Sequence, residues 1–278
     1  MRPGIATRVR STATLITFLA AALGACAVSP RQEIELGQQY AAEISRQLPI
    51  VNDAEINAYI NALGNQIAQH TTRREFSYRF YVVNTDAVNA FAIPGGFVYV
   101  NRGLIERTEN LSELAAVLAH EIAHVDERHG AEQMERMQRA NVGLTLAYIL
   151  IGRAPGGLER AAIQLGGAAV FASYSRSAER EADETAIPLL VAAGIDPRGM
   201  PSFFRTLLEE RSRRPGAVEQ WFATHPLAED RIAQAEAQIA QYPPERLRSL
   251  TTNSAEFEAF KARVRALPPP PPEFRAQG

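Results

Sequence analysis

The chain has 278 residues, of which 46% are hydrophobic, so it can form one large domain or two small ones around a compact core. Its formal net charge is −2, so no basic excess points to nucleic-acid binding. The charges are also spread along the chain, without the block of like charges that is typical of an interaction tail.

The first 25 residues have the layout of a secretory signal. Several arginines lie close to the start, and an uncharged apolar run, TLITFLAAALGA, follows them. This run is too short and too rich in small residues to be a convincing membrane span. A retained anchor helix is the alternative interpretation.

The segment LGAC, which ends this run, resembles the bacterial lipobox, in which cleavage before the cysteine accompanies lipidation of its thiol. Cys26 is the only cysteine of the chain, so no intramolecular disulfide can form and no other thiol is left for catalysis or zinc binding. We therefore expect a lipid anchor that holds the mature protein at a periplasmic membrane surface. Ala27, rather than an aspartate, follows the cysteine, which favours the outer membrane.

Two amphipathic helices are expected between residues 31 and 70. In the second of them Ile56, Ile60 and Leu63 recur at steps of three and four residues, which is the period of one helix face. Asn52 and Asp53 precede this pattern and offer a helix cap.

The period then changes to that of strands. Residues 76–84, FSYRFYVVN, alternate and are rich in aromatic and β-branched side chains, so we expect a strand there. Residues 89–103 predict two short strands, because the turn sequence Pro94-Gly95-Gly96 divides them.

Helices dominate the rest of the chain. They are expected at about 112–139, 177–193, 198–213 and 227–241. The tail LPPPPPEF favours an extended conformation. The sequence therefore predicts an α+β protein that is mainly helical, with one small sheet. Its expected parts are the signal at 1–25, one domain at 26–245, and a C-terminal helix with a proline-rich tail at 246–278.

Residues 141–170 form an apolar, glycine-rich stretch between the expected helices. It begins with VGLTLAYILIG, which is too short to span a bilayer. Two interpretations stay open. The stretch is either buried core, or a mobile flap or membrane-facing patch near the functional site.

The segment LAHEIAHVDERHG, residues 118–130, contains the strongest motif. His120 and His124 are four residues apart, so on a helix they stand one above the other on one face. Glu121 lies between them, where its carboxylate can reach a water on a metal that both imidazoles hold. The spacing therefore predicts a zinc site with Glu121 as general base.

His129 is a tempting third ligand, but on a continuous helix it would be half a turn out of phase with His120 and face away. The alternative motif with a third histidine on the same segment also fails, because Glu127 and Gly130 occupy the positions that it needs for glycine and histidine. We expect His129 to be a structural or capping residue.

The third ligand is sought in YSRSAEREADETA, residues 174–186, where Glu179, Glu181 and Asp183 compete. Glu179 and Asp183 are four residues apart on one helix face, whereas Glu181 points away from them. A suitable pair is a ligand, Glu179, followed one turn later by Asp183, which holds a ligand histidine by its other ring nitrogen. The site would be His2Glu with one position open for water, as in catalytic zinc sites.

Three segments together resemble one known family. The segments VNAFAIPGGFVYVNRGL, ELAAVLAHEIAHVDERH and YSRSAEREAD are similar to the zinc metallopeptidases that include CAAX prenyl endopeptidases, HtpX-type heat-shock proteases and BepA-type periplasmic proteases. The resemblance covers about residues 33–231. It implies a zincin-like (gluzincin) fold with one Zn²⁺, and it gives His120, His124 and Glu179 as zinc ligands, Glu121 as the base and Asp183 as their supporting acid.

The resemblance also implies peptide hydrolysis by a zinc-activated water, whose proton Glu121 takes. The developing oxyanion needs a further donor, for which Tyr174, Arg176 and His225 are the candidates. We expect a polypeptide substrate to add to an exposed sheet edge formed by the segment from Asn89 to Val100, which flanks the zinc cleft. An ordinary core hairpin is the alternative for this segment, but the resemblance favours the edge.

His225 has two possible roles besides that of a simple cap. Pro226 suits the first position of a helix, so His225 is expected at a helix start. Its imidazole could occupy the open zinc position as a latch, or it could stand back and stabilise the oxyanion. We favour the latch.

The function predicted from these residues is that of a zinc-dependent endopeptidase of the bacterial cell envelope, acting on unfolded or misassembled proteins. The alternative is a zinc-stabilised periplasmic chaperone or assembly factor with little proteolysis. Glu121 distinguishes the two, because a purely structural zinc site needs no base between its ligands.

Overall fold

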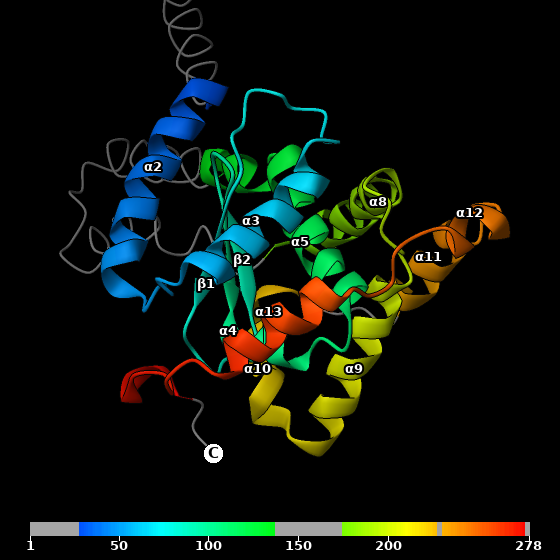
Figure 1. The fold of residues 1–278 in the computed structure, drawn as a ribbon. Helices are drawn as coiled ribbons and strands as arrows, with labels where there is room; N and C mark the ends of the chain where they lie inside the picture. The colour runs from blue at the N-terminus through cyan, green and yellow to red at the C-terminus, as the bar shows by residue number, and fades with distance from the viewer. Residues whose placement is uncertain (1–27, 137–173, 227–229, 276–278) are drawn as a thin grey trace, which may run out of the picture. The chain divides into compact units, whose positions relative to one another are not determined.

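The computed structural model describes residues 28–136, 174–226 and 230–275 (Figure 1). The chain divides into two units, and the smaller one comprises Met1–Ser29 and Ala131–Val170. Within its described part, the Val28 amide donates to Glu135 Oε1 at 2.9 Å. The expected signal, Cys26 and the stretch 141–170 lie outside the described residues. All features below belong to the larger unit, Pro30–Gly130 with Phe171–Gly278.

Three strands form the sheet of this unit, in the order β1-β3-β2. They are β1 (Arg79–Val83), β2 (Ala90–Ile93) and β3 (Phe97–Asn101), and β3 pairs parallel to β1 and antiparallel to β2. The turn between β2 and β3 places Gly95 and Gly96 at φ of 85° and 93°, a region that glycine enters without steric cost. The predicted pair of short strands is therefore confirmed.

The edge prediction needs a correction. Within the described sheet, β3 is the central strand and β1 and β2 are the edge strands, so of the segment's two strands only β2 lies at an edge. The segment from Asn89 to Val100 thus contains one edge strand, β2, and the central strand, β3. Strand β3 is central because β1 pairs in parallel with the side of β3 that β2 leaves free.

Helices cover both faces of the sheet (Figure 1). One face, with Phe80, Val82 and Val98, joins the main core under α3 (Ala54–Ala68), whose cap is Asp53 as predicted. The opposite face, with Tyr99, packs against the first described helix, α2 (Pro30–Gln47). The alternation of buried side chains along β1 and β3 thus divides the apolar residues between two layers.

Helix α5 (Leu111–Asp126) lies at the centre of the core. All of its residues are buried, and it contacts α3, β2, α8 (Arg176–Ala192) and α9 (Gly199–Arg213). Asn110 caps its start by accepting a hydrogen bond from the Glu113 amide at 3.2 Å. A helix that is buried on all sides gives its polar side chains fixed positions inside the protein.

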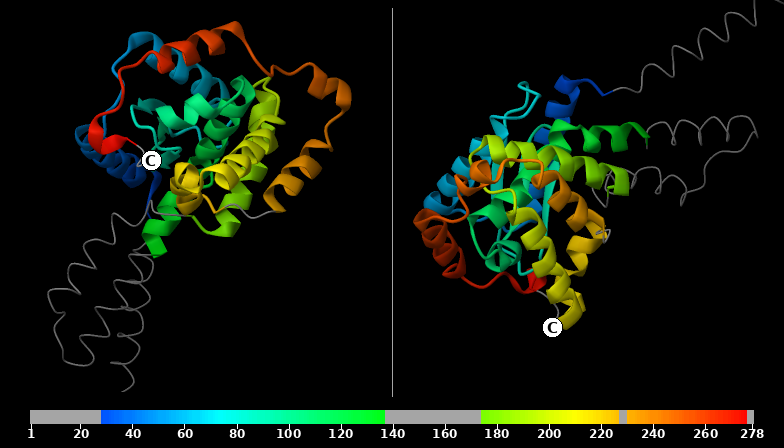
Figure 2. Two further views of the ribbon diagram at one scale, coloured as in Figure 1. Left: turned by 90° about the horizontal axis from the view of Figure 1, so that it is seen from below. Right: turned by 90° about the vertical axis from the view of Figure 1, so that its right-hand side faces the viewer.

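The remaining described elements are largely helical. They are α4 (Arg102–Arg107), α8 (Arg176–Ala192), α9 (Gly199–Arg213), α10 (Pro215–Thr224), α11 (Asp230–Ile239), α12 (Pro244–Arg248), α13 (Ala255–Arg265) and the 3-10 turn η2 (Pro272–Phe274). Helix α13 packs against α3 and α4 (Figure 2). The short helices α4 and α10 were not predicted from the sequence.

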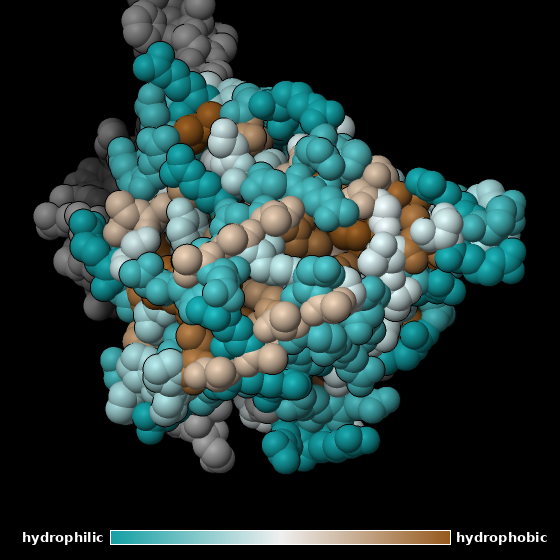
Figure 3. All heavy atoms as spheres, in the orientation of Figure 1, coloured by the Kyte–Doolittle hydropathy of each residue, from teal (hydrophilic) through white to brown (hydrophobic). Residues whose placement is uncertain are grey.

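The described surface is largely hydrophilic on the face in Figure 3, where apolar residues appear in small groups. None of the helices within the described ranges is both long and apolar enough to cross a bilayer. The predicted class, a mainly helical α+β protein with one small sheet, is confirmed.

Candidate metal centre and active site

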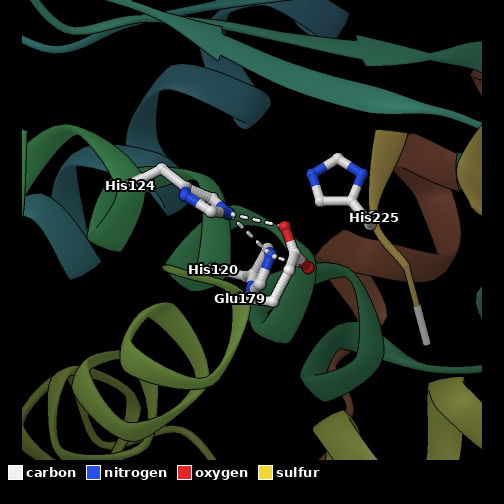
Figure 4. Close-up of side chains that lie close together, drawn as sticks. All are labelled: His120, His124, Glu179 and His225. Atoms are coloured by element: carbon white, nitrogen blue, oxygen red, sulfur yellow. Dashed lines mark hydrogen bonds and ion pairs between the residues drawn. The ribbon is translucent and has the colours of Figure 1, made fainter. Parts of the chain in front are cut away.

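Helix α5 places its two motif histidines side by side. His120 and His124 are one turn apart, and their Nε2 atoms approach to 3.0 Å with the rings nearly perpendicular (Figure 4). Both side chains are buried, and so is Glu121 between them. The helical phase of the motif thus brings two imidazoles to one point, as the spacing predicts.

Helix α8 supplies the two carboxylates that face this pair. Ser175 caps α8 by accepting from the Ala178 amide at 3.2 Å, so Glu179 and Asp183 fall one turn apart on the face toward α5. Glu179 Oε1 lies 3.4 Å from His124 Nε2, and its Oε2 lies 3.5 Å from His120 Nε2. Asp183 Oδ1 lies 2.9 Å from the other ring nitrogen, Nδ1, of His120.

These separations fit a metal site. Ligand atoms bound to zinc at about 2.05 Å in a tetrahedron are about 3.3 Å apart. The three Nε2 and Oε contacts among His120, His124 and Glu179 measure 3.0, 3.4 and 3.5 Å. Two imidazoles with one carboxylate are also the donor set of catalytic zinc sites. The arrangement can therefore hold a metal ion without a change of fold.

His225 joins this group from α10. Ligand atoms of His120, His124, Glu179 and His225 all lie within 4.8 Å of one another (Figure 4). The nearest carboxylate to His225 is the base candidate, because His225 Nε2 is 3.2 Å from Glu121 Oε1. His225 thus stands at the open side of the His2Glu set.

The surroundings of His225 correct its predicted position. It is the C-cap of α10 rather than the residue before a helix at Pro226, and only 1% of it is exposed. Its ring stacks on Trp221 with 4.6 Å between centroids, and its Nδ1 lies 2.9 Å from Thr224 Oγ1. The helix that ends at Thr224 therefore aims the His225 side chain into the protein interior, toward the other histidines.

Arg231 was not identified from the sequence. Its guanidinium is buried and binds Asp183 through Nε at 2.6 Å and Nη2 at 2.8 Å. Its Nη1 donates to Glu179 Oε2 at 2.7 Å. One arginine thus orients both carboxylates of α8. It lies on the buried face of α11 with Ala235 and Ile239, but its carboxylate partners lie on α8, so only the tertiary structure shows this role.

The buried charges move the pKa values of the site apart. Burial disfavours a charged imidazole, but hydrogen bonds to nearby carboxylates raise the pKa of His120 to about 9. Burial lowers the pKa of His124 to about 4, against the opposite effect of Glu179. Burial alone would raise the pKa of Glu121, but the neighbouring His225 lowers it below its usual range. Glu121 is therefore ionised at neutral pH, as a proton acceptor must be.

His129 does not face away, in contrast to the prediction from a continuous helix. Helix α5 ends at Asp126, and Arg128 adopts a left-handed conformation with φ of 60°. This turn brings His129 Nδ1 to 2.9 Å from His124 Nδ1. Glu181, which was expected to point away from the site, lies with Oε2 at 3.3 Å from His129 Nε2.

The two other oxyanion candidates differ in position. The ring of Tyr174 stacks on that of His124 with 3.9 Å between centroids, and burial raises the pKa of its hydroxyl. Arg176 is exposed at the first residue of α8. The structure thus brings Tyr174 to the site and leaves Arg176 at the surface.

Comparison with known proteins gives a consistent result. A model described as Peptidase family M48 matches residues 54–239. The beta-barrel assembly-enhancing protease of Escherichia coli (strain K12) is 35% identical over 242 residues, which cover 84% of this chain and 48% of that protein. Metalloprotease YcaL of the same strain is 30% identical over 212 residues, covering 75% of this chain and 76% of the relative.

A more distant relative is the mitochondrial metalloendopeptidase OMA1 of Schizosaccharomyces pombe. It is 27% identical over 191 residues, which cover 69% of this chain and 55% of that protein. The chain spans about half the length of the beta-barrel assembly-enhancing proteases that it matches.

Proposed function

The chain belongs to peptidase family M48, and from this premise we propose that it is a zinc-dependent endopeptidase of the bacterial cell envelope that cleaves unfolded or misassembled proteins. That it is a metalloprotease follows from the family. The observation that supports the finer proposal is the buried Glu121 carboxylate beside two imidazoles and a carboxylate at tetrahedral spacing.

Each residue of the site has a role in this proposal. His120, His124 and Glu179 hold the ion. When bound, zinc would polarise the scissile carbonyl and acidify a water. Asp183 holds His120 by Nδ1, so that Nε2 presents its lone pair to the ion. Arg231 orients the α8 carboxylates through its hydrogen bonds to Glu179 and Asp183.

Glu121 is proposed to move the proton. Its carboxylate is buried next to the ligand histidines and ionised at neutral pH, so it can take a proton from the attacking water and deliver it to the leaving nitrogen. A carboxamide of the same shape keeps the packing but cannot accept this proton.

Substrate is proposed to bind along β2. A cleft of 770 Å³ lies at the end of the sheet where β2 begins, and it is lined among others by Asn89, which precedes β2, by Phe91 of β2 and by Thr224 of α10. The Thr224 hydroxyl donates to Asn89 Oδ1 at 3.1 Å, next to His225. A chain that adds to the edge would meet the site through backbone hydrogen bonds, which give affinity with little sequence preference.

His225 is proposed to latch the site. A ligand atom of His225 lies within 4.8 Å of those of His120, His124 and Glu179, and Thr224 and Trp221 hold the ring beside them. With the latch, His225→Ala raises proteolysis and self-cleavage while zinc is retained. If the imidazole instead stabilises the oxyanion, the same change lowers kcat by about 10²-fold or more. An unchanged activity and zinc affinity would refute both roles.

A lipid on Cys26 is proposed to place the protein at the periplasmic face of the outer membrane. Cys26→Ser should then release the mature protein from the membrane fraction. Recovery of that variant in the same fraction as the parent would refute the anchor.

The decisive test of the enzyme proposal is Glu121→Gln. We expect casein cleavage to fall by several orders of magnitude while bound zinc, measured by atomic absorption, stays at one ion per chain. The matched control is Glu184→Gln, an exposed acid on α8, which should cleave like the parent. A Glu121→Gln variant that retains zinc and full cleavage would refute the proposal and favour the chaperone alternative.

A further inference from the structure

The Nδ1 atoms of the two ligand histidines, His120 and His124, contact different partners. His120 meets the carboxylate of Asp183, but the Nδ1 atom of His124 meets another imidazole, that of His129, at 2.9 Å. His129 is only 3% exposed. Glu181 continues the contact, with Oε2 at 3.3 Å from His129 Nε2. These three residues, His124, His129 and Glu181, form what we call the histidine relay.

Only one arrangement of hydrogens fits the relay if His124 binds an ion through Nε2. Its Nε2 is then a lone pair, so the hydrogen of the neutral ring must be on Nδ1. His124 can donate this hydrogen to His129 only if Nδ1 of His129 carries no hydrogen and acts as the acceptor. The remaining hydrogen of His129 is then on Nε2, where it faces the Glu181 carboxylate.

We propose that His129, supported by Glu181, is a positioning residue that fixes the tautomer and ring orientation of the metal ligand His124. The inference rests on the proposed function, because it requires His124 to bind zinc. Partners behind a ligand histidine raise its basicity and hold its ring, and their loss typically costs about 10- to 100-fold in metal affinity.

The backbone around His129 is built to hold this position. Arg128 adopts φ of 60°, which a residue other than glycine rarely enters, and its Nε donates to Glu33 Oε2 of α2 at 2.9 Å. On the other side Thr185 Oγ1 of α8 donates to Glu127 Oε1 at 2.8 Å. Helices α2 and α8 thus secure the turn from two directions.

The turn is also tied at its start. The Asp126 carboxylate accepts hydrogen bonds from the Thr72 amide at 3.0 Å and the Arg73 amide at 2.9 Å. Arg73 Nε donates to the Asp126 carbonyl oxygen at 2.7 Å. A strained conformation persists only where its surroundings enforce it, and here the enforced turn directs His129 at His124.

The test compares His129→Ala, His129→Asn, Glu181→Ala and the control Glu184→Ala, which changes an exposed acid on the same helix. Zinc affinity is measured by competition with a chromophoric chelator. The absorption spectrum of the Co²⁺-substituted protein reports ligand geometry, and urea unfolding of the metal-free protein reports stability.

We expect His129→Ala to weaken zinc binding by about 10- to 100-fold and to change the Co²⁺ spectrum. His129→Asn should restore much of the affinity, because its amide oxygen can accept the hydrogen of His124 Nδ1. Glu181 is 58% exposed at its side chain, so Glu181→Ala should cost only a few-fold, and Glu184→Ala nothing.

Two results would overturn the inference. One is a His129→Ala variant with parental zinc affinity and Co²⁺ spectrum; the other is a loss of affinity that His129→Asn does not restore. Failure of the proposed function looks different. A parent protein that binds zinc but does not cleave casein would refute the enzyme proposal and leave the inference about His124 intact, whereas a parent that binds no zinc would remove the premise of both.

Discussion

Replacing Arg231 by methionine should destabilise the metal-free protein more than any exposed charge change. The Arg231 guanidinium is 1% exposed and makes three hydrogen bonds of 2.6 to 2.8 Å to Asp183 and Glu179. Methionine keeps an apolar chain of similar length against Phe204, over whose ring the guanidinium now lies at 4.7 Å. The variant therefore isolates the loss of the charge from the loss of packing.

The expected loss of stability comes from the two carboxylates that stay buried when Arg231 is replaced. Without Arg231, two buried carboxylates lose their cation, and removal of one partner from a buried ion pair typically costs about 3–5 kcal/mol. The three charge-assisted bonds would sum to more if they were independent, but they share one guanidinium and are not additive. We therefore expect a loss of about 3–5 kcal/mol, a large part of the usual stability of about 5–15 kcal/mol.

The measurement is urea unfolding in the presence of a chelator, followed by circular dichroism. The control is Arg180→Met on α8, whose partner Asp230 lies 3.7 Å away with both side chains about half exposed; it should cost less than about 1 kcal/mol. Arg231→Lys keeps the charge with fewer directed donors, so its loss should fall between the two. A loss below about 1 kcal/mol for Arg231→Met would refute the reasoning.

Three further predictions concern packing, pH and metal removal. Gly37→Ala should lower stability by about 1–3 kcal/mol in thermal unfolding, because an added Cβ would lie 1.9 Å from the Pro94 carbonyl oxygen. The control is Gly216→Ala, where the added Cβ would meet open space, and equal melting temperatures of the two variants would contradict the clash. Burial alone would raise the pKa of Asp196, but its hydrogen bonds from Arg198 hold that pKa below the ordinary 3.8. A carboxyl group whose pKa is lowered by folding stabilises the folded state at pH values above its unfolded pKa. This contribution disappears as the pH falls through the pKa of the folded state. Asp196→Asn should thus be less stable than the parent at pH 7, by about 1–2 kcal/mol, and this difference should shrink below about pH 4. A difference in stability that does not change with pH would contradict the prediction. Chelation of zinc that is present at 1,000 times its Kd should lower stability by about 4 kcal/mol, and an unchanged urea midpoint would contradict binding at the site.

Helical phase explains why much of the site was predictable. The spacing of His120 and His124 fixes their relation on α5, and that of Glu179 and Asp183 does the same on α8. These relations need only 3.6 residues per turn, a local property of the chain. The paired short strands were also predictable, because Gly95 and Gly96 mark their turn.

The parts that failed depend on contacts between distant segments. The prediction for His129 assumed a continuous helix, but the left-handed turn at Arg128 carries no glycine that would have indicated it. Its cause is tertiary, since the Arg128 side chain binds Glu33, 95 residues earlier in the chain. Arg231 was missed for the same reason: its partners, Glu179 and Asp183, lie on another helix.

Helix α2 begins at Pro30, only a few residues after Cys26, and this short separation bears on how far from a membrane a lipid-anchored enzyme could act. If Cys26 carries the lipid, only residues 27–29 separate the anchor from the helix, and the four residue-to-residue steps from Cys26 to Pro30 can extend to no more than about 14 Å. A tether of this length confines the folded domain to a thin layer above the bilayer. Within that layer, proteins attached to the same membrane are met at a high effective concentration, whereas freely diffusing ones are not. The anchor would thus select substrates by where they reside, which complements the proposed binding along β2 through backbone hydrogen bonds with little sequence preference.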